Sequence, residues 1–305
     1  MYSIQMPRFE FTGKTAVVTG SGSGIGRAAA LELAYYGANV VVADISAAAA
    51  EATVAEITEN GGSAMAWVTD VSQSAQVDAL VAATVERFGS LDIFISNAGV
   101  GGEVLPLLEQ TEEEFEHVLS VNLKGAFLCG KAAAKQMIAQ GKGGRIIITA
   151  SIAAIEGGGF HGPYGASKGG IVTLVRTMGR EWAQYGITVN AVSPGLTATG
   201  INETLAQQPE VLESLLDKIP LHRMACLLYT SPACDKLFVA KGEIVGGVGY
   251  QDYSCSEGVF FRVKDGNDFF QKQLEVGNHV PLVYGDYFDQ VVALGKQLGL
   301  EVITA

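Results

Sequence analysis

The sequence predicts an α/β fold built on a doubly wound parallel sheet. Short apolar runs alternate with longer helical stretches, and this alternation repeats six times before about residue 193. A glycine-rich turn over residues 19–26 follows the first apolar run and leads into the first helical stretch. Because this connection is typical of dinucleotide-binding βα units with right-handed crossovers, both observations favour the same architecture.

Each expected strand is a short apolar run bounded by Gly, Asp, Asn or Ser. Such runs are typical of parallel strands, which are buried on both faces. The strands are expected at residues 15–19, 39–44, 64–68, 91–95, 145–149 and 187–192. Helices are expected between them, at residues 25–36, 47–59, 73–88, 111–139 and 164–185, with a further one at 205–218.

Length and charge limit the class of protein. The 305 residues suffice for one large α/β domain, or for one domain and a smaller one. A net charge of −12 argues against a nucleic-acid partner. Residues 1–12 lack the apolar run of a signal peptide, and no stretch of about 18 apolar residues occurs. We therefore expect a cytoplasmic protein without a membrane partner.

The glycine turn predicts a nucleotide site. Gly20, Gly24 and Gly26 allow a tight turn against a pyrophosphate, whose charge the following helix N-terminus favours. Asp44 ends the second expected strand, where its carboxylate would bind the adenosine ribose and repel a 2′-phosphate. No Arg or Lys at 21–25 or 45–46 offsets that charge, so NAD is favoured over NADP. Alternatively, the turn is an ordinary strand–helix loop and Asp44 a turn residue.

Tyr164 and Lys168 predict proton-transfer chemistry. Four residues apart, they share one face of a helix, where the cation can favour a phenolate and lower the pKa of Tyr164. Ser151 lies thirteen residues before Tyr164. A dinucleotide turn combined with such an acid/base group specifies hydride transfer to or from an alcohol carbon.

With these motifs, residues 8–223 resemble the short-chain dehydrogenase/reductase family, which implies a Rossmann-type fold. The resemblance implies a catalytic set of Asn122, Ser151, Tyr164 and Lys168. It implies cofactor contacts from Gly20, Ser23, Gly24, Ile25, Gly26, Asp44, Asp70, Val71, Asn97, Ala98, Gly99, Tyr164, Lys168, Pro194, Gly195, Thr197 and Thr199. No metal ligand is expected.

The resemblance also implies roles. Tyr164 would be the general base in oxidation and the acid in reduction, and Lys168 would lower its pKa and bind the nicotinamide ribose. Ser151 would hydrogen-bond the substrate oxygen, and Asn122 would hold a water linked to Lys168. The structural alternatives are a strand-end cap for Ser151, a packing amide for Asn122 and an interface aromatic for Tyr164. His161 could face either substrate or solvent.

Substrate selection is expected from the loops after the strands, at residues 100–108, 152–162 and 196–208. They are rich in glycine and apolar residues and hold few charges, so a small neutral alcohol or ketone is favoured over a dicarboxylate. The expected function is NAD(H)-dependent interconversion of a secondary alcohol and a ketone.

The family resemblance stops near residue 224, and the usual last strand of the sheet is missing. Residues 226–231 resemble a translated transposase-end adapter, and residues 234–305 resemble the C-terminal segment of the L-fucose isomerase family. The predicted domains are therefore 1–223, a junction at 224–233, and a small α+β segment at 234–305. We interpret the chain as a chimera; a genuine fusion is the alternative.

The α+β segment is expected to form strands at 236–243, 258–263 and 280–285 and helices at 268–277 and 289–298. His279 matches a metal-binding histidine of the isomerase family, but its acidic partners have no counterpart, so no metal site is expected.

Two other functions remain open: a truncated dinucleotide-binding chain without turnover, and an aldose–ketose isomerase fragment. The dehydrogenase family implies a homo-oligomer, whereas the missing strand argues against that assembly here.

Overall fold

The computed structural model describes residues 10–157, 159–200, 209–217, 219, 224–225, 259–262 and 301–304. The chain divides into two units. The first comprises residues 1–204 and 225–232, and the second comprises residues 205–224 and 233–305.

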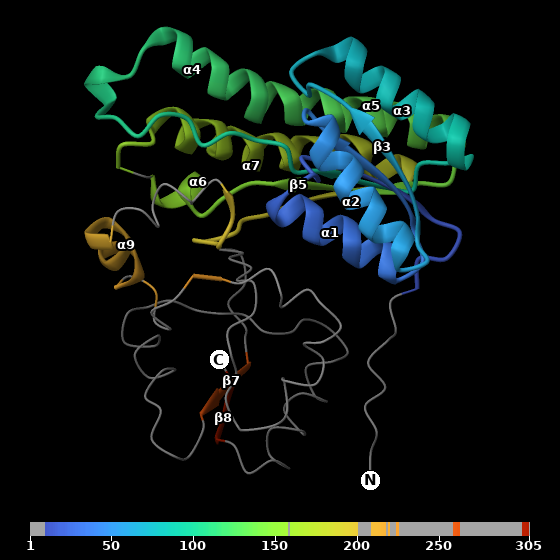
Figure 1. The fold of residues 1–305 in the computed structure, drawn as a ribbon. Coiled ribbons are helices and arrows are strands. Elements are labelled where there is room, and N and C mark those ends of the chain that lie inside the picture. Colours follow the sequence, from blue (N-terminus) through green and yellow to red (C-terminus); the bar gives the residue numbers. More distant parts are fainter. Residues whose placement is uncertain are drawn as a thin grey trace. The chain divides into compact units, whose positions relative to one another are not determined.

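The first unit is built on a six-stranded parallel sheet (Figure 1). The strand order is β3-β2-β1-β4-β5-β6, and every neighbouring pair is parallel. The order reverses between β1 and β4, which opens a crevice at their carboxyl ends. The predicted doubly wound sheet is confirmed. The strands are β1 Thr15–Thr19, β2 Asn39–Asp44, β3 Ser63–Val68, β4 Ile93–Ser96, β5 Gly144–Thr149 and β6 Ile187–Val192.

Helices cover both faces of the sheet and create two buried cores. One core lies under α1 and α2 and includes Leu33 and Ile57. The other lies under α3, α5 and α7 and includes Leu80, Met137 and Ile171. The α-helices of this unit are α1 Gly24–Tyr35, α2 Ala47–Glu59, α3 Ser74–Phe88, α4 Glu112–Leu119, α5 Gly125–Gln140, α6 Ala153–Glu156 and α7 Gly162–Trp182.

The predicted helix at 111–139 is not continuous. It consists of α4 and α5 joined by a π-helical turn, η2, at Ser120–Lys124. Asn122 lies in this turn, where the wider helix changes the direction of its side chain. Two short 3₁₀ turns, η1 Leu107–Glu109 and η3 Ala183–Tyr185, complete the unit.

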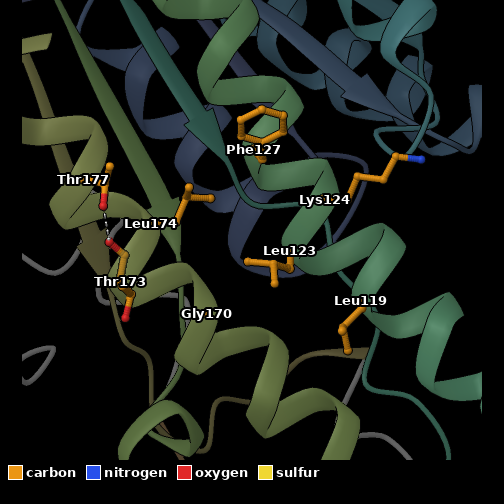
Figure 2. Close-up of a pocket in the computed structure, with 8 residues that line it drawn as sticks. All are labelled: Leu119, Leu123, Lys124, Phe127, Gly170, Thr173, Leu174 and Thr177. Atoms are coloured by element: carbon orange, nitrogen blue, oxygen red, sulfur yellow. Dashed lines mark hydrogen bonds between the residues drawn. The ribbon is translucent and has the colours of Figure 1, made fainter. Parts of the chain in front are cut away.

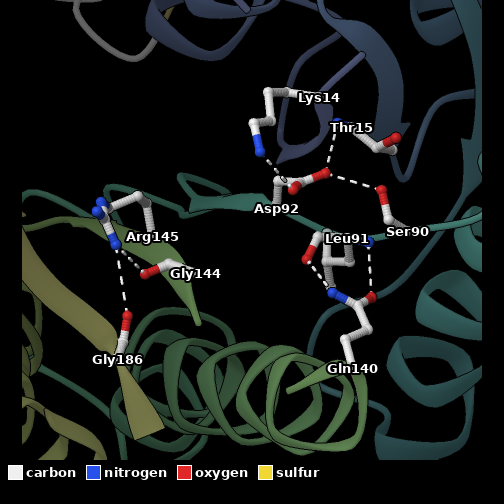
Figure 3. Close-up of polar contacts among 9 residues, drawn as sticks. All are labelled: Lys14, Thr15, Ser90, Leu91, Asp92, Gln140, Gly144, Arg145 and Gly186. Carbon is white, nitrogen blue, oxygen red and sulfur yellow. Dashed lines mark hydrogen bonds and ion pairs between the residues drawn. The ribbon is translucent and has the colours of Figure 1, made fainter. Parts of the chain in front are cut away.

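Polar contacts brace the amino ends of the strands, opposite the crevice (Figure 3). The Asp92 carboxylate accepts hydrogen bonds from the Thr15 backbone at 3.0 Å and the Ser90 hydroxyl at 2.8 Å, and it pairs with Lys14 at 3.2 Å. Burial acts to raise the pKa of Asp92, but these hydrogen bonds outweigh it and lower the pKa. Asp92 thus ties the start of β1 to the start of β4. The strand predicted at 91–95 begins two residues later than expected, because the Leu91 backbone pairs with the Gln140 side chain and Asp92 takes part in this bracing.

In the second unit the described residues form a helix, α9 Pro209–Leu216, and an antiparallel pair, β7 Val259–Arg262 with β8 Glu301–Thr304. β7 confirms the strand predicted at 258–263, and α9 falls within the helix predicted at 205–218. β8 was not predicted. Among the described residues, no helix combines the length and hydropathy needed to cross a membrane.

The other elements predicted for the tail, at 236–243, 268–277, 280–285 and 289–298, lie outside the described residues. So do His279 and nearly all of the proposed adapter-derived junction. The chimeric origin and the isomerase-like tail stay predictions.

Candidate functional site

Residues predicted to bind a cofactor or to act in catalysis lie at the carboxyl ends of five strands. Gly20 follows β1, Asp44 ends β2, Asn97 follows β4, Ser151 follows β5 and Pro194 follows β6. Parallel strands bring these positions to one edge of the sheet, around the point where the strand order reverses. Sequence positions up to 174 apart therefore meet along a single crevice.

The glycine turn after β1 is packed too tightly for side chains. A Cβ on Gly20, whose φ is +62°, would lie 2.8 Å from the Ala98 Cα. A Cβ on Gly26 would overlap the Gly20 carbonyl oxygen and lie 2.5 Å from Nδ2 of Asn97. The turn therefore rests directly on the segment after β4, as a close approach to a pyrophosphate requires.

The N-terminus of α1 fits an anion. Its N-cap, Ser23, makes no side-chain capping hydrogen bond, and the first turn holds no acidic residue. Backbone N–H groups of such a turn attract phosphate, because the helix dipole adds to their partial charge. Thr199 lies beside the turn, since its Cβ is 3.5 Å from the position of a Cβ on Gly24. The structure brings these two predicted cofactor contacts together.

Asp44 shapes the neighbouring turn. Its Oδ2 accepts a hydrogen bond from the Gly22 N–H at 2.9 Å, and its Oδ1 accepts one from the Ser46 N–H at 3.0 Å. Asp44 is thus a turn residue, the alternative raised by the sequence. Each carboxylate oxygen retains a lone pair, so a ribose hydroxyl can still donate to it. Arg27, in the first turns of α1, forms an ion pair with Glu56.

Asn97 connects β1, β4 and β5. Its Nδ2 donates to the carbonyls of Thr19 at 3.1 Å and Gly20 at 3.2 Å, and its Oδ1 accepts from the Thr149 hydroxyl at 3.2 Å. The Thr19 hydroxyl in turn accepts the N–H groups of Asn97 and Ala98. The sequence-based reasoning missed both threonines. A hydroxyl side chain at the carboxyl end of a buried strand is the signal that identifies them.

The remaining predicted cofactor contacts line the same edge in supporting positions. Asp70 accepts hydrogen bonds from the Ser72 N–H and hydroxyl, and the hydroxyl bond is the largest cause of its lowered pKa. Val71 is buried against Gly125. The Pro194 carbonyl accepts the Ile152 N–H, and the Gly195 carbonyl accepts the Thr197 hydroxyl. These contacts hold the loops after β3 and β6.

Lys168 is buried, with 4% of its surface exposed. Its Nζ donates to the Thr149 carbonyl at 2.8 Å and lies 5.5 Å from the centroid of the Tyr164 ring. A Cβ on Gly99 would lie 3.5 Å from this Nζ. The ammonium therefore lies between the carboxyl ends of β4 and β5.

Asn122 is buried beside Lys168 and fixes the loop after β4. Its Oδ1 accepts the Val100 N–H at 2.8 Å, and its Nδ2 donates to the Val100 carbonyl at 3.0 Å and to the Ser167 hydroxyl at 3.1 Å. The Ser167 hydroxyl donates a hydrogen bond to the Tyr164 carbonyl at 2.7 Å. Ser167, which the sequence-based reasoning missed, thus joins Asn122 to the backbone of Tyr164.

The Tyr164 hydroxyl hydrogen-bonds with Ser151, whose Oγ also accepts the Ala153 N–H at 3.2 Å. Burial raises the pKa of Tyr164, and the Ser151 hydrogen bond only partly offsets this. The expected lowering of this pKa by Lys168 is wrong for this structure. The ammonium lies over the ring and bonds Thr149, so it does not contact the hydroxyl.

Lys168 gives a pH-dependent prediction for stability. Burial lowers its pKa from 10.5 to about 8, so between these values the unfolded chain holds more protons here than the folded chain. The free energy of unfolding should therefore rise with pH across this window, by up to about 3 kcal/mol, and the gain should be lost as pH falls to about 8.

The check is urea unfolding between about pH 7.5 and 9.5, for the wild type and for Lys168→Met, which keeps an apolar stem but does not titrate. As pH rises, the free energy of unfolding of the wild type should increase relative to that of Lys168→Met. A difference that stays flat would show that the amine is solvated.

A separate groove lies between η2, α5 and α7, away from these residues (Figure 2). Its volume is about 640 Å³, and its lining is mainly apolar. None of the predicted catalytic or cofactor residues lines it. The lining residues are Leu119, Leu123, Lys124, Phe127, Gly170, Thr173, Leu174 and Thr177.

Comparisons with known proteins agree with this geometry. A family model described as short chain dehydrogenase matches residues 14–210. A 3-oxoacyl-[acyl-carrier-protein] reductase of Synechocystis sp. is 42% identical over 213 residues, which cover 70% of this chain and 83% of that protein. Levodione reductase of Leifsonia aquatica is 40% identical over 210 residues, covering 68% and 78%.

Two solved structures are also similar. The crystal structure of levodione reductase matches with a TM-score of 0.69 and 36% identity, covering 75% of this chain and 91% of that one. The crystal structure of NAD+-bound xylitol dehydrogenase matches with a TM-score of 0.69 and 33% identity, covering 76% and 94%.

Proposed function

The chain belongs to the short chain dehydrogenase family, and we propose that it is an NAD(H)-dependent oxidoreductase that interconverts a secondary alcohol and a ketone. The observation that carries the proposal is the placement of Tyr164 next to Ser151 and to the buried Lys168, whose Nζ lies 5.5 Å from the Tyr164 ring centroid. Reductase and dehydrogenase names among the relatives support the reaction class.

The residues present fit a dinucleotide. The uncapped N-terminus of α1 would hold the pyrophosphate, and Asp44 would accept a hydroxyl of the adenosine ribose. Lys168 would bind the nicotinamide ribose from inside the crevice. When bound, the nicotinamide supplies the hydride that reduces a carbonyl carbon, or accepts the hydride that leaves an alcohol carbon.

The protein's own groups would handle the proton. In reduction, Tyr164 donates its hydroxyl proton to the carbonyl oxygen; in oxidation, its phenolate takes the proton from the alcohol. The Ser151 hydroxyl would hydrogen-bond the same substrate oxygen as its charge changes. Because burial raises the pKa of Tyr164, the acid form dominates at neutral pH. Asn122 and Ser167 hold the backbone around Tyr164 in place.

The direct experiment assays the purified chain with NAD or NADP against a panel of secondary alcohols, together with a thermal melt. NAD should raise the melting temperature, since a ligand that binds only the folded state stabilises it. NAD-dependent oxidation of at least one alcohol supports the proposal. A melting temperature insensitive to both dinucleotides, together with no turnover, would reject it.

Cofactor choice gives a further prediction. Asp44→Asn keeps the size of the side chain but removes the charge that repels a 2′-phosphate. Relative to the wild type, the ratio of kcat/KM for NAD to that for NADP should fall at least about tenfold, because a hydrogen bond to a charged group is worth about 1.5–3 kcal/mol. Asp78→Asn, an exposed residue of α3, is the matched control and should leave the ratio unchanged. An unaltered ratio in Asp44→Asn would remove Asp44 from the cofactor site.

A further inference from the structure

Apolar side chains stay exposed in the loops that adjoin Ser151 and Tyr164. Leu107 is 71% exposed, Phe160 is 59% exposed and Ile152 is 37% exposed. All three lie in loops that the sequence predicts to select the substrate. We call Leu107, Ile152 and Phe160 the apolar rim. Exposed apolar groups that gather beside polar catalytic groups are typical of a ligand site.

Contacts hold the apolar rim against the segment that leads into Tyr164. The Leu107 Cδ1 lies 2.6 Å from the position of a Cβ on Gly162, so Leu107 packs against the first residue of α7, two residues before Tyr164. The Leu105 N–H donates to the Phe160 carbonyl at 3.0 Å, which ties the loop after β4 to the loop before α7.

The third rim residue adjoins Ser151. Ile152 directly follows Ser151, and its N–H donates to the Pro194 carbonyl at 3.2 Å. Its Cδ1 lies 3.8 Å from the position of a Cβ on Gly195. The apolar rim therefore lies in the segments that adjoin Ser151 and Tyr164.

Phe160 is held in a costly backbone conformation. Its φ is +66°, and among the described residues other than glycine it alone has a positive φ. For a bulky side chain this left-handed conformation is sterically unfavourable, and such strain concentrates at ligand clamps. Phe160 is thus an exposed aromatic side chain in a strained conformation, in a loop otherwise rich in glycine.

The charged side chains within the rim segments are all acidic. Segments 100–110 and 151–162 contain no Lys or Arg. They contain Glu103, Glu109 and Glu156, and all three are exposed. An anionic substrate would be repelled by these carboxylates, and a hydroxyl placed against Leu or Phe side chains would lose hydrogen bonds to water.

We infer that the substrate presents an uncharged, apolar ring or alkyl chain to the apolar rim; this inference rests on the proposed function. The site thus takes an alicyclic or aliphatic ketone and the matching alcohol. It discriminates against polyols and against acyl groups carried on anionic thioesters. The rim supplies the binding energy of the apolar body, while Ser151 and Tyr164 hold the oxygen.

The first test uses three six-membered rings that differ only at the position opposite the reacting alcohol: 4-methylcyclohexanol, 1,4-cyclohexanediol and 4-hydroxycyclohexanecarboxylate. With NAD, kcat/KM should be highest for the methyl compound. It should fall about tenfold to a hundredfold for the diol, the range by which apolar pockets discriminate such groups. The carboxylate should be the poorest.

The outcomes distinguish a wrong substrate class from a wrong proposed function. The inference is overturned if kcat/KM for the diol or for the carboxylate equals or exceeds that for the methyl compound. It is also overturned if a linear polyol, assayed beside the three rings, is the one alcohol oxidised. In both cases the proposed function stands. No turnover of any alcohol, together with a melting temperature insensitive to NAD and NADP, overturns the proposed function and the inference with it.

The second test replaces Phe160 by asparagine, which tolerates a positive φ, so the loop keeps its conformation. For 4-methylcyclohexanol, kcat/KM should fall about tenfold, mainly through KM, as expected for loss of apolar contact. The ratio of kcat/KM for 4-methylcyclohexanol to that for the diol should fall, while the melting temperature stays within error of the wild type. Phe115→Asn, the same change at an exposed position of α4, is the control. An unchanged methyl-to-diol ratio in Phe160→Asn would overturn the inference.

Discussion

Replacing Tyr164 by phenylalanine is expected to lower kcat by about 10²–10⁴-fold, the usual contribution of a positioned acid/base group. The ring remains and still fills the space next to Lys168, while the hydroxyl that bonds Ser151 is removed. Binding of NAD should therefore change little, and the shift in melting temperature caused by NAD should persist. Steady-state kinetics and the melt with NAD measure the two effects separately.

The control for this prediction is Tyr185→Phe. Tyr185 lies in η3 and is exposed, so the same loss of a hydroxyl there should leave kcat unaltered. If Tyr164→Phe retains more than about a tenth of the wild-type kcat, the phenol is not the acid/base group, and the chemistry proposed for this site is wrong.

Replacing Gly26 by alanine is expected to disrupt the glycine turn. The added methyl overlaps the Gly20 carbonyl oxygen, a backbone atom that cannot move as a flexible side chain can. Forcing a methyl into such a packed contact costs about 1–3 kcal/mol of folding free energy. The turn must open, so its N–H groups no longer meet a pyrophosphate, and the Kd for NAD should rise at least about tenfold.

Gly179→Ala is the matched control for Gly26→Ala. Both glycines lie in helices, but a Cβ on Gly179 would meet the Val189 carbonyl oxygen at 3.6 Å, an ordinary contact. Alanine is the better helix former, so this variant should gain up to about 1 kcal/mol. Urea unfolding and NAD titration compare the two. Equal behaviour of both variants would show that the Gly26 turn is neither tight nor part of the cofactor site.

Most of the fold could be predicted from the sequence because each strand of the parallel sheet is a short apolar run with polar boundaries. β2, for example, was predicted with both ends correct, since Asn39 and Asp44 bound four apolar residues. The break at Ser120–Lys124 could not be predicted, because the apolar pattern continues through the π-helical turn and only the hydrogen-bond spacing changes.

The positions of the site residues could be predicted better than their electrostatics. Ser151, Tyr164 and Lys168 come together as the motif spacing indicates. The direction in which the pKa of Tyr164 shifts could not be predicted, because it depends on how deeply the ring is buried and on which atom the ammonium contacts. Sequence spacing fixes a helix face but neither of these quantities. The supporting roles of the Thr19 and Thr149 hydroxyls could not be predicted either, because threonine is common at strand ends and does not by itself indicate a site.

The π-helical turn that carries Asn122 has a consequence for engineering this chain. Each residue rotates an α-helix by about 100°, so one surplus residue in a wide turn offsets everything that follows it by that angle. Deleting a single residue between Ser120 and Lys124 would give a smoother and intrinsically more regular rod from α4 to α5. The amide at 122 would then swing out of its contact with Val100. The same offset would turn the buried face of α5, which carries Met137, out of its core, so screens for thermal robustness and for turnover should both discard that deletion.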